Sequence, residues 1–546
     1  MMKSRNILSA LMLAAPLAVG AQTPWCHIYS TDESAFISMP LDRIKDTRFN
    51  PMGTNFTSVV FEDSQGEQTM DFEVFDKWVI GANVATIYIT TDDTPILDIS
   101  DKTTKYPAHI VVDGAGIYED IESTPITFRG RGNSTLNYPK KAYNIKFESK
   151  TRICDFKKAK SYVLLANWID GSFMRNYAAF SFGRMIGMPY CNSCRPVDVY
   201  LNDNYKGTYT LTQKCGFNNG SVDLKKEDEA NSVMIELDTC DPAAGVTMEY
   251  GGFTPLLRIP YQLKDPDAPA DELEAKEWWI EWAMDFEELE AAVMSGSDIS
   301  ELVDYDTLAR YLMVYNLACN QELNHPKSVM LWKTKGGKWQ FGPCWDFDWA
   351  FGYKQTYQSF EESSDSEARR KHYEELYEKC KKEYGEKYYQ FVDSDGTLCW
   401  WIDMVPGQFD IYCFNSKGYL VSYMECDSSV PRPSYESPLL ATGKNTQSGP
   451  FGNGGEFFLA MIENNQEFLD VYAKIWAEVE PKVNDWLKEF DAYSEELKPS
   501  ANREVLTDTG KHYPTETNAK AVKELKSWIK NRIKYIGNPE NNYGLY

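Results

Sequence analysis

The amino-acid sequence predicts an α+β protein, with a β-rich N-terminal lobe followed by an α-rich C-terminal lobe. Three observations lead to this fold class. Short runs of β-branched and aromatic residues recur between residues 84 and 211. Apolar residues at helical spacing dominate long stretches after residue 271. Strand-like and helix-like segments do not alternate one by one, which argues against the βαβ units of a parallel sheet.

The predicted strands of the first lobe alternate apolar and polar residues over short runs. A helix over residues 172–185, ended by Gly187, separates the earlier strands from a hairpin. The hairpin has its turn-rich loop at residues 202–206. The strands are expected at residues 84–90, 109–112, 126–128, 143–147, 197–201, 207–211 and 233–237.

The second lobe is expected to be built of long helices with one insertion. The insertion covers about residues 355–450, and it combines a charged helix, two strands and a loop rich in Ser, Pro and Gly. Its charged helix is predicted over residues 366–388, and its strands over 409–414 and 419–424. Helices are predicted at residues 272–295, 304–318, 456–490 and 518–536.

The first 21 residues have the pattern of a secretory signal peptide. Lys3 and Arg5 precede an apolar stretch over residues 7–19, and small residues follow at Gly20 and Ala21. Export to the periplasm, the cell surface or the medium is therefore expected, with no membrane span in the mature chain. Residues 22–83 are expected to form a small β-rich leader before the main domain.

The 546 residues carry a formal net charge of −25. A strongly acidic chain repels phosphate backbones, so nucleic acid is excluded as an expected partner. This negative charge is compatible with basic protein partners or with bound cations, and it does not distinguish between the two.

A basic, glycine-rich segment at residues 128–135 is the first candidate for chemistry. Arg129 and Arg131 alternate with glycines there, and Lys141 and Lys146 follow, just before and within the next predicted strand. Backbone N–H groups in such a turn approach an anion closely, and the lysines can reach the same anion. The alternative is an ordinary basic hairpin.

Two carboxylates, Asp346 and Asp348, lie inside the strongly aromatic run at residues 339–352. Aromatic neighbours desolvate a carboxylate at high cost, and a bound cation such as Mg²⁺ offsets that cost. The alternative is a strand whose aspartates point to solvent or pair with arginine.

Glu322 lies in a loop at the end of a predicted helix, shortly before a strand and the aspartate pair. A carboxylate in this position can act as a base near a bound metal. The alternative is that the loop only caps the helix end.

The order of these segments along the chain resembles the motif series of the CotH (spore coat protein H) family of atypical, protein-kinase-like proteins. The resemblance covers roughly residues 84–353 and implies a divergent, two-lobed protein-kinase-like fold, with residues 84–546 as one domain. The segments that carry it, in order, are 129–135 with the paired lysines 140–141, 164–170 with 174–176, 199–207, the Glu322 loop, and 345–352.

The resemblance implies an ATP-dependent protein kinase that transfers the γ-phosphate to Ser or Thr hydroxyls of a protein substrate. Asp346 matches the family's Mg²⁺-binding aspartate, with Asp348 as a second metal ligand. Glu322 stands where the family has a catalytic aspartate, with His325 after it and Ser328 where an asparagine is expected. The nucleotide-binding residues implied are Arg129, Arg131, Lys141 and Lys146.

Two other functions remain open from the sequence. The first is a non-catalytic binding or structural protein of the cell envelope or surface, which would bind an envelope partner. The second is a metal-dependent hydrolase that uses the aspartate pair, although the basic segment would then have no role.

Overall fold

The computed structural model describes residues 84–92, 99, 102–132, 135, 140–238, 250–324, 326–352, 434–440, 454–504 and 518–546, together with the strands within residues 25–81 and 389–425. The predicted signal peptide and the predicted helix over residues 366–388 lie outside this set. No helix in the described ranges is long and apolar enough to cross a membrane.

Seven of the described strands close into a barrel in the order β10-β11-β13-β12-β7-β8-β9. All neighbouring pairs in it are antiparallel except β12 and β7, which run parallel. The strands are β7 (Ala85–Thr91), β8 (Tyr106–Asp113), β9 (Ile121–Arg131), β10 (Ala142–Thr151), β11 (Ala159–Leu165), β12 (Cys194–Leu201) and β13 (Asn204–Gln213).

Side chains alternate between the interior of the barrel and its outer face. On β10, Tyr143, Ile145 and Phe147 are buried in the barrel core, whereas Asn144 and Lys146 point the other way. The outer face of β9 and β10 is therefore available for contacts outside the barrel.

A second sheet of five described strands follows, in the order β15-β16-β14-β17-β18. Its central strand, β14, is buried along its whole length and pairs with β16 and β17. The strands are β14 (Ser232–Leu237), β15 (Gly251–Phe253), β16 (Pro260–Asp265), β17 (Val329–Thr334) and β18 (Gln340–Phe341).

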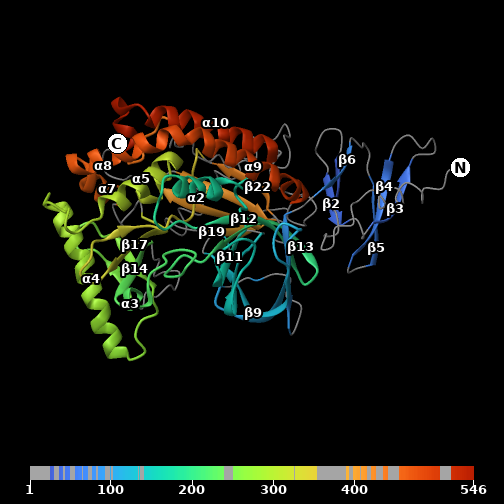
Figure 1. Ribbon diagram of the computed structural model, residues 1–546, viewed down its shortest axis with the longest axis horizontal. Coiled ribbons are helices and arrows are strands. Elements are labelled where there is room, and N and C mark those ends of the chain that lie inside the picture. The colour runs from blue at the N-terminus through green and yellow to red at the C-terminus, as the bar shows by residue number, and fades with distance from the viewer. Residues whose placement is uncertain are drawn as a thin grey trace.

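The helices form a layer against this sheet and one side of the barrel (Figure 1). Nearly every residue of α5 is buried, and α5 contacts α2, α8 and α10, so it is the centre of the helical core. The longer helices are α2 (Arg175–Met185), α4 (Glu272–Met294), α5 (Tyr305–Ala318), α7 (Gly454–Ile462), α8 (Gln466–Val479), α9 (Val483–Arg503) and α10 (Asn518–Ile536).

The expectation of a two-lobed kinase-like fold is wrong, although the α+β class holds. The early strands and the predicted hairpin share one closed barrel, because β7 pairs in parallel with β12 more than a hundred residues later. The helix α2 falls between two barrel strands, and β17 and β18 follow α4 and α5. Strands and helices are therefore interleaved along the chain and are not divided into a β lobe and an α lobe.

Several local predictions are confirmed. The hairpin is β12 and β13, and the helices at 272–295 and 304–318 are α4 and α5. The single helix predicted over residues 456–490 is instead three helices. Asn464 takes a left-handed conformation and Asn465 caps the start of α8, which separates α7 from α8, and the short 3-10 helix Glu480–Lys482 with its proline separates α8 from α9.

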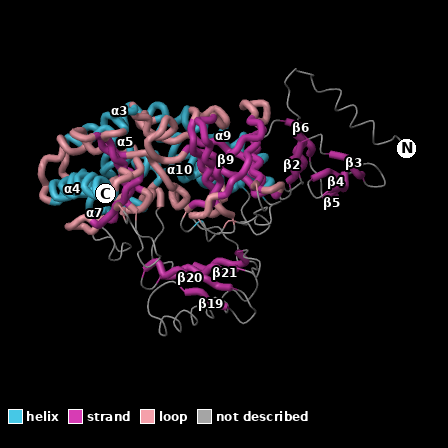
Figure 2. The backbone as a smooth tube through the Cα atoms, turned by 90° about the horizontal axis from the view of Figure 1, so that it is seen from below, coloured by secondary structure: helices cyan, strands magenta, loops and turns pink. Residues whose placement is uncertain are grey.

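Other described strands form smaller sheets. Two sheets precede the barrel, in the orders β2-β1-β6 and β3-β4-β5, and a third, β19-β20-β21-β22, is set apart from the barrel and helices in Figure 2. The two strands predicted in the insertion are β21 and β22. The bounds are β1 (Trp25–Tyr29), β2 (Phe36–Pro40), β3 (Ile44–Phe49), β4 (Phe56–Asp63), β5 (Gly66–Asp71), β6 (Lys77–Gly81), β19 (Tyr389–Val392), β20 (Leu398–Val405), β21 (Gln408–Phe414) and β22 (Leu420–Glu425).

The end of α9 is joined to the barrel by buried charges. The Nζ of Lys140 lies 2.7 Å from Oε1 of Glu504, and both side chains are almost fully buried. Glu504 also accepts a hydrogen bond of 2.7 Å from the backbone N–H of Thr208 on β13. Arg503 pairs with Asp198 on β12, to which Ser500 also donates. These contacts connect parts of the chain about 300 residues apart.

Candidate functional site

A cavity of about 550 Å³ lies between the outer face of the barrel and the second sheet. Five of its lining residues are cationic, so the cavity carries positive charge that would favour an anion. The barrel contributes Arg129, Gly130, Arg131, Gly132, Asn144 and Val163, and the rest of the lining is Lys102, Thr103, Lys214, Cys215, Lys264 and Trp345.

The strands explain how the basic, glycine-rich segment reaches this cavity. On β9, Phe128 is buried in the barrel, so Arg129 and Arg131 point outward on the same face. Gly132 follows with φ +97°, and a Cβ there would lie 1.8 Å from Oγ1 of Thr135. Only glycine fits this turn, which keeps the backbone of the segment close to the cavity.

Arg131 connects the cavity to a group of carboxylates. Its guanidinium carbon lies 5.3 Å from the ring centroid of Trp345, at a distance that suits a cation–π contact. Burial lowers the pKa of Arg131, while the negative charges of Asp346, Glu236 and Asp348 act in the opposite direction. The guanidinium therefore lines the cavity and interacts electrostatically with these three carboxylates.

Lys264 makes a second connection. It projects from β16, and its Nζ lies 2.6 Å from Oε2 of Glu236 on the neighbouring strand β14. Burial lowers the pKa of Lys264, but the charge and hydrogen bond of Glu236 together with Cys215 act in the opposite direction, and on balance the pKa of this lysine is raised. Lys264 stays charged at neutral pH where it lines the cavity.

The segment that carries Asp346 and Asp348 is held by one side chain from α2 and one from just after α5. Asn320 donates a hydrogen bond of 3.0 Å from Nδ2 to the carbonyl of Asp346, which has φ +62°. The Oδ1 of Asn176, on α2, accepts a bond of 3.0 Å from the N–H of Phe347, and its Nδ2 donates to Asp348. One asparagine thus fixes both the backbone and a carboxylate of this segment.

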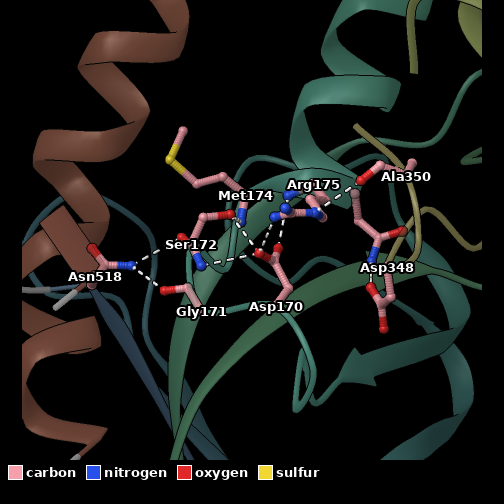
Figure 3. A network of polar contacts seen from close by, with 9 residues as sticks. Asp170, Gly171, Ser172, Met174, Arg175, Asp348, Ala350 and Asn518 are labelled. Atoms are coloured by element: carbon pink, nitrogen blue, oxygen red, sulfur yellow. Dashed lines mark hydrogen bonds and ion pairs between the residues drawn. The ribbon is translucent and has the colours of Figure 1, made fainter. Parts of the chain in front are cut away.

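The start of α2 is itself fixed by a polar network around Asp170 (Figure 3). The buried carboxylate of Asp170 accepts hydrogen bonds from Ser172 and from the backbone and guanidinium of Arg175. Arg175 also donates a bond of 3.0 Å from Nε to the carbonyl of Ala350. Asn518, from α10, donates to the carbonyls of Gly171 and Ser172. The network holds the aspartate segment against α2.

Glu322 lies in the short helix Gln321–Leu323, close enough to the aspartates to interact with them electrostatically. Burial raises its pKa well above the usual range, and the charge of Asp346 adds to this, while Lys327 opposes it. No group in the described part of the chain bonds its buried Oε2 atom. Burial likewise raises the pKa of Asp348, with Asp346 next in importance.

Asp238 is a carboxylate that the sequence reasoning missed. It follows β14 directly, is only 8% exposed, and its Oδ1 is buried without a hydrogen-bond partner among the described residues. Burial and the neighbouring Glu236 raise its pKa to about 7. The negative charge of Asp346 contributes in the same direction, so Asp238 belongs to the same group of carboxylates.

The raised pKa of Asp238 predicts a pH-dependent stability. In the unfolded chain the pKa of the Asp238 carboxyl is near 3.8. Below that pH the carboxyl is protonated in both the folded and the unfolded state, so it does not change the free energy of unfolding. Between that value and about 7, only the unfolded chain ionises, so the folded state loses stability as the pH rises. Asp238→Asn should remove a penalty of up to about 4 kcal/mol at pH 8 and change little at pH 4. Thermal melts at both pH values measure this, and the exposed Asp267→Asn should shift neither melt.

These residues suit a Mg²⁺ ion that is completed by phosphate oxygens. Among the described residues, no group of three or more His, Cys, Asp or Glu side chains is arranged to hold a metal alone. Mg²⁺ usually takes one or two carboxylates together with water and phosphate oxygens, so such a group is not required. Asp346 and Asp348 could supply those carboxylates, and burial next to Asp346 raises the pKa of Asp348 despite the opposing charge of Arg175.

The structure brings together most, but not all, of the residues predicted from the sequence. Arg129 and Arg131 line the cavity, and Arg131 interacts with the aspartate pair. Lys141 and the exposed Lys146 do not line it. The lysines that do are Lys102, Lys214 and Lys264, and no motif marked them, since each lies at or beyond a strand end in an ordinary polar context.

Comparison with known proteins bears on this site. Residues 128–394 match the family model described as CotH kinase protein. The matched range begins at the basic segment and includes Glu322 and both aspartates, so the resemblance read from the sequence is confirmed. No curated protein matches the chain.

Proposed function

From the CotH kinase match over residues 128–394, we propose that this protein is an ATP-dependent phosphotransferase that modifies Ser or Thr hydroxyls of a protein. One observation carries the proposal: a cationic cavity adjoins a group of carboxylates, and Arg131 interacts with both. Phosphoryl transfer needs this pairing, because cations must hold the phosphates while carboxylates hold a metal and the acceptor hydroxyl.

In this proposal the cavity binds the phosphates of ATP. Arg129, Lys214 and Lys264 line it and carry positive charge toward an anion. Guanidinium groups bind phosphate through paired N–H donors, and lysines act as point charges. Asn144 adds a neutral amide on the same outer face of the barrel. The ion pair with Glu236 orients Lys264, because the ammonium group lies 2.6 Å from the carboxylate.

Asp346 and Asp348 are proposed to hold Mg²⁺, which when bound neutralises charge on the phosphates. The side chains around them act by positioning. Asn176 and Asn320 bond the segment at Asp346, Phe347 and Asp348, so the two carboxylates are presented from a fixed backbone. Preorganised groups of this kind need no rearrangement during the reaction.

Glu322 is proposed to accept the proton of the acceptor hydroxyl. A base must be ionised to accept a proton, and burial together with Asp346 raises the pKa of Glu322. Activity should therefore rise with pH as the Glu322 carboxyl ionises.

Calorimetric titration of ATP with Mg²⁺ into the full chain tests the cavity. The wild-type chain should bind, and Lys214→Gln should bind about tenfold more weakly, because one charge-assisted hydrogen bond is lost. Lys146→Gln is the matched control, since this lysine is exposed on β10 and lies outside the cavity lining. Its affinity should equal that of the wild type.

Absence of ATP binding in a wild-type chain that melts cooperatively would overturn the proposal. It would favour a binding or structural protein of the cell surface. Equal weakening by Lys214→Gln and Lys146→Gln would show that ATP binds by general charge attraction and not in this cavity.

The N-terminal 21 residues support a further part of the proposal, that the protein acts after export. Its acceptor would then be a protein of the same compartment, in the periplasm, at the cell surface or outside the cell. Transfer of phosphate to proteins of the exported fraction, and to none of the cytoplasmic fraction, would support this.

A further inference from the structure

The helix α4 has an apolar face turned away from the rest of the protein. Figure 1 shows α4 along one edge of the molecule. Its inner face buries Ala275, Trp279, Trp282, Phe286, Leu289 and Val293. On the outer face, Leu273, Ile280 and Met284 are 67%, 55% and 65% exposed. Single exposed apolar residues are common on proteins, but these three share one helix face.

Helix geometry places them in one line. At about 100° per residue, Leu273, Ile280 and Met284 fall within roughly 20° of a common direction. The exposed Ala291 lies on the same line about two turns further on. The stripe from 273 to 291 is about 27 Å long at 1.5 Å per residue, which is the length of a partner helix of five turns.

One edge of the stripe is acidic. Glu277, Glu288, Glu281 and Glu274 are all exposed and lie between about 40° and 100° to one side of it. Of these, Glu281 lies 2.6 Å from Lys335 in an exposed ion pair. On the other side, Glu287 accepts a hydrogen bond from Tyr261, and Lys276 pairs with Glu272. Most of the negative charge therefore follows one edge of the apolar line.

We propose that the outer face of α4 is a docking surface for a basic amphipathic helix of another protein. The apolar side of such a helix would cover Leu273, Ile280 and Met284, and its Lys or Arg residues would lie along the glutamate edge. Side-by-side packing of two helices suits a straight apolar stripe with charges beside it, and the charges select the partner and its orientation.

The charges beside the stripe also favour a basic helix over two other binding partners, a second copy of this chain and a membrane surface. In an antiparallel dimer formed through α4, the glutamate edges of the two copies would lie on the same side and repel. In a parallel dimer, each glutamate edge would face the other edge of the second copy, which carries one lysine and two glutamates. A helix that lies on a membrane carries Lys and Arg beside its apolar face, because the lipid surface is negative. The edge of α4 carries glutamates instead, which disfavours binding to a membrane.

Fluorescence anisotropy with the full chain tests the proposal. The probe is a labelled 18-residue helical peptide with leucines on one face and lysines beside them, and the comparison peptide has glutamates in place of the lysines. The lysine peptide should bind, and the double variant Ile280→Gln, Met284→Gln should bind it at least tenfold more weakly. Glutamine is a good helix former, and both sites are exposed, so the fold is kept. Ile117→Gln, at a 54% exposed site outside α4, should leave the affinity unchanged.

Each other outcome counts against the proposal. Equal binding of the two peptides, or equal affinity of the wild type and the double variant, would overturn it. A dimer in sedimentation that the double variant abolishes would assign the face to a second copy. Flotation with phosphatidylglycerol vesicles that the double variant abolishes would assign it to a lipid surface.

Discussion

Asp346→Asn is expected to weaken Mg²⁺-dependent ATP binding by about 100- to 1000-fold, the scale expected when one preorganised electrostatic partner is lost. The substitution tests charge rather than backbone conformation. Asp346 has φ +62°, and asparagine is among the residues that tolerate this left-handed region best. The hydrogen bond that the Asp346 carbonyl accepts from Asn320 is also kept.

The measurement is a calorimetric titration of ATP with and without Mg²⁺. Without the metal, the variant should bind ATP no more weakly than the wild type, because a negative charge near the cationic cavity has been removed. Asp203→Asn is the matched control, since Asp203 has φ +63° and is exposed in the turn between β12 and β13. If Asp346→Asn binds Mg²⁺ and ATP as the wild type does, Asp346 holds no metal and the proposed function loses its metal site.

Lys140→Met is expected to destabilise the folded chain by about 3–5 kcal/mol, because it leaves the carboxylate of Glu504 buried without its positive partner. Lys140 is 3% exposed, and its Nζ also donates to the carbonyl of Thr208 and lies over the rings of Phe173 and Tyr209. Burial lowers the pKa of this lysine, and Glu504 acts in the opposite direction, so the pair depends on both members.

A double-mutant cycle in urea separates the charge from the packing. Adding Glu504→Gln to Lys140→Met should recover much of the lost free energy of unfolding, because no buried charge is then unpaired. Lys146→Met, at an exposed position on β10, should change stability by less than about 0.5 kcal/mol. Strictly additive effects of the two substitutions would show that the ion pair contributes nothing of its own.

Individual helices and hairpins could be predicted from the sequence where neighbouring residues carry the signal, such as turn residues, helical spacing or an N-cap. The hairpin of β12 and β13 follows from its turn residues, and α4 and α5 follow from helical spacing and from Asp271 and Asp304 at their N-caps. The closure of the barrel could not be predicted, because alternation of apolar and polar residues indicates a strand but not the strand with which it pairs. The parallel pairing of β7 with β12 joins distant parts of the chain.

The same distinction holds for the candidate site. Arg129, Arg131 and the aspartate pair lie in unusual sequence contexts. Both arginines line the cavity, Arg131 interacts with the aspartates, and the aspartates interact with Glu322. Lys141 and Lys146 were predicted to bind nucleotide because they follow the basic segment in sequence. Neither lines the cavity, because closeness in sequence does not determine which way a side chain points. Lys214 and Lys264 reach the cavity only through the packing of the barrel against the second sheet. The roles of all these residues stay predictions until binding is measured.

The buried contacts between the barrel and the end of α9 have a consequence for the order in which a growing chain can fold. Translation completes the last barrel strand at Gln213, whereas Glu504 is 296 residues beyond Thr208, to which it bonds. Until that part of the chain emerges, Lys140 and Asp198 have neither Glu504 nor Arg503 beside them. A nascent barrel would therefore leave these two charges, which the end of α9 covers in the finished fold, exposed to water, and it should reach its final packing only near the end of synthesis.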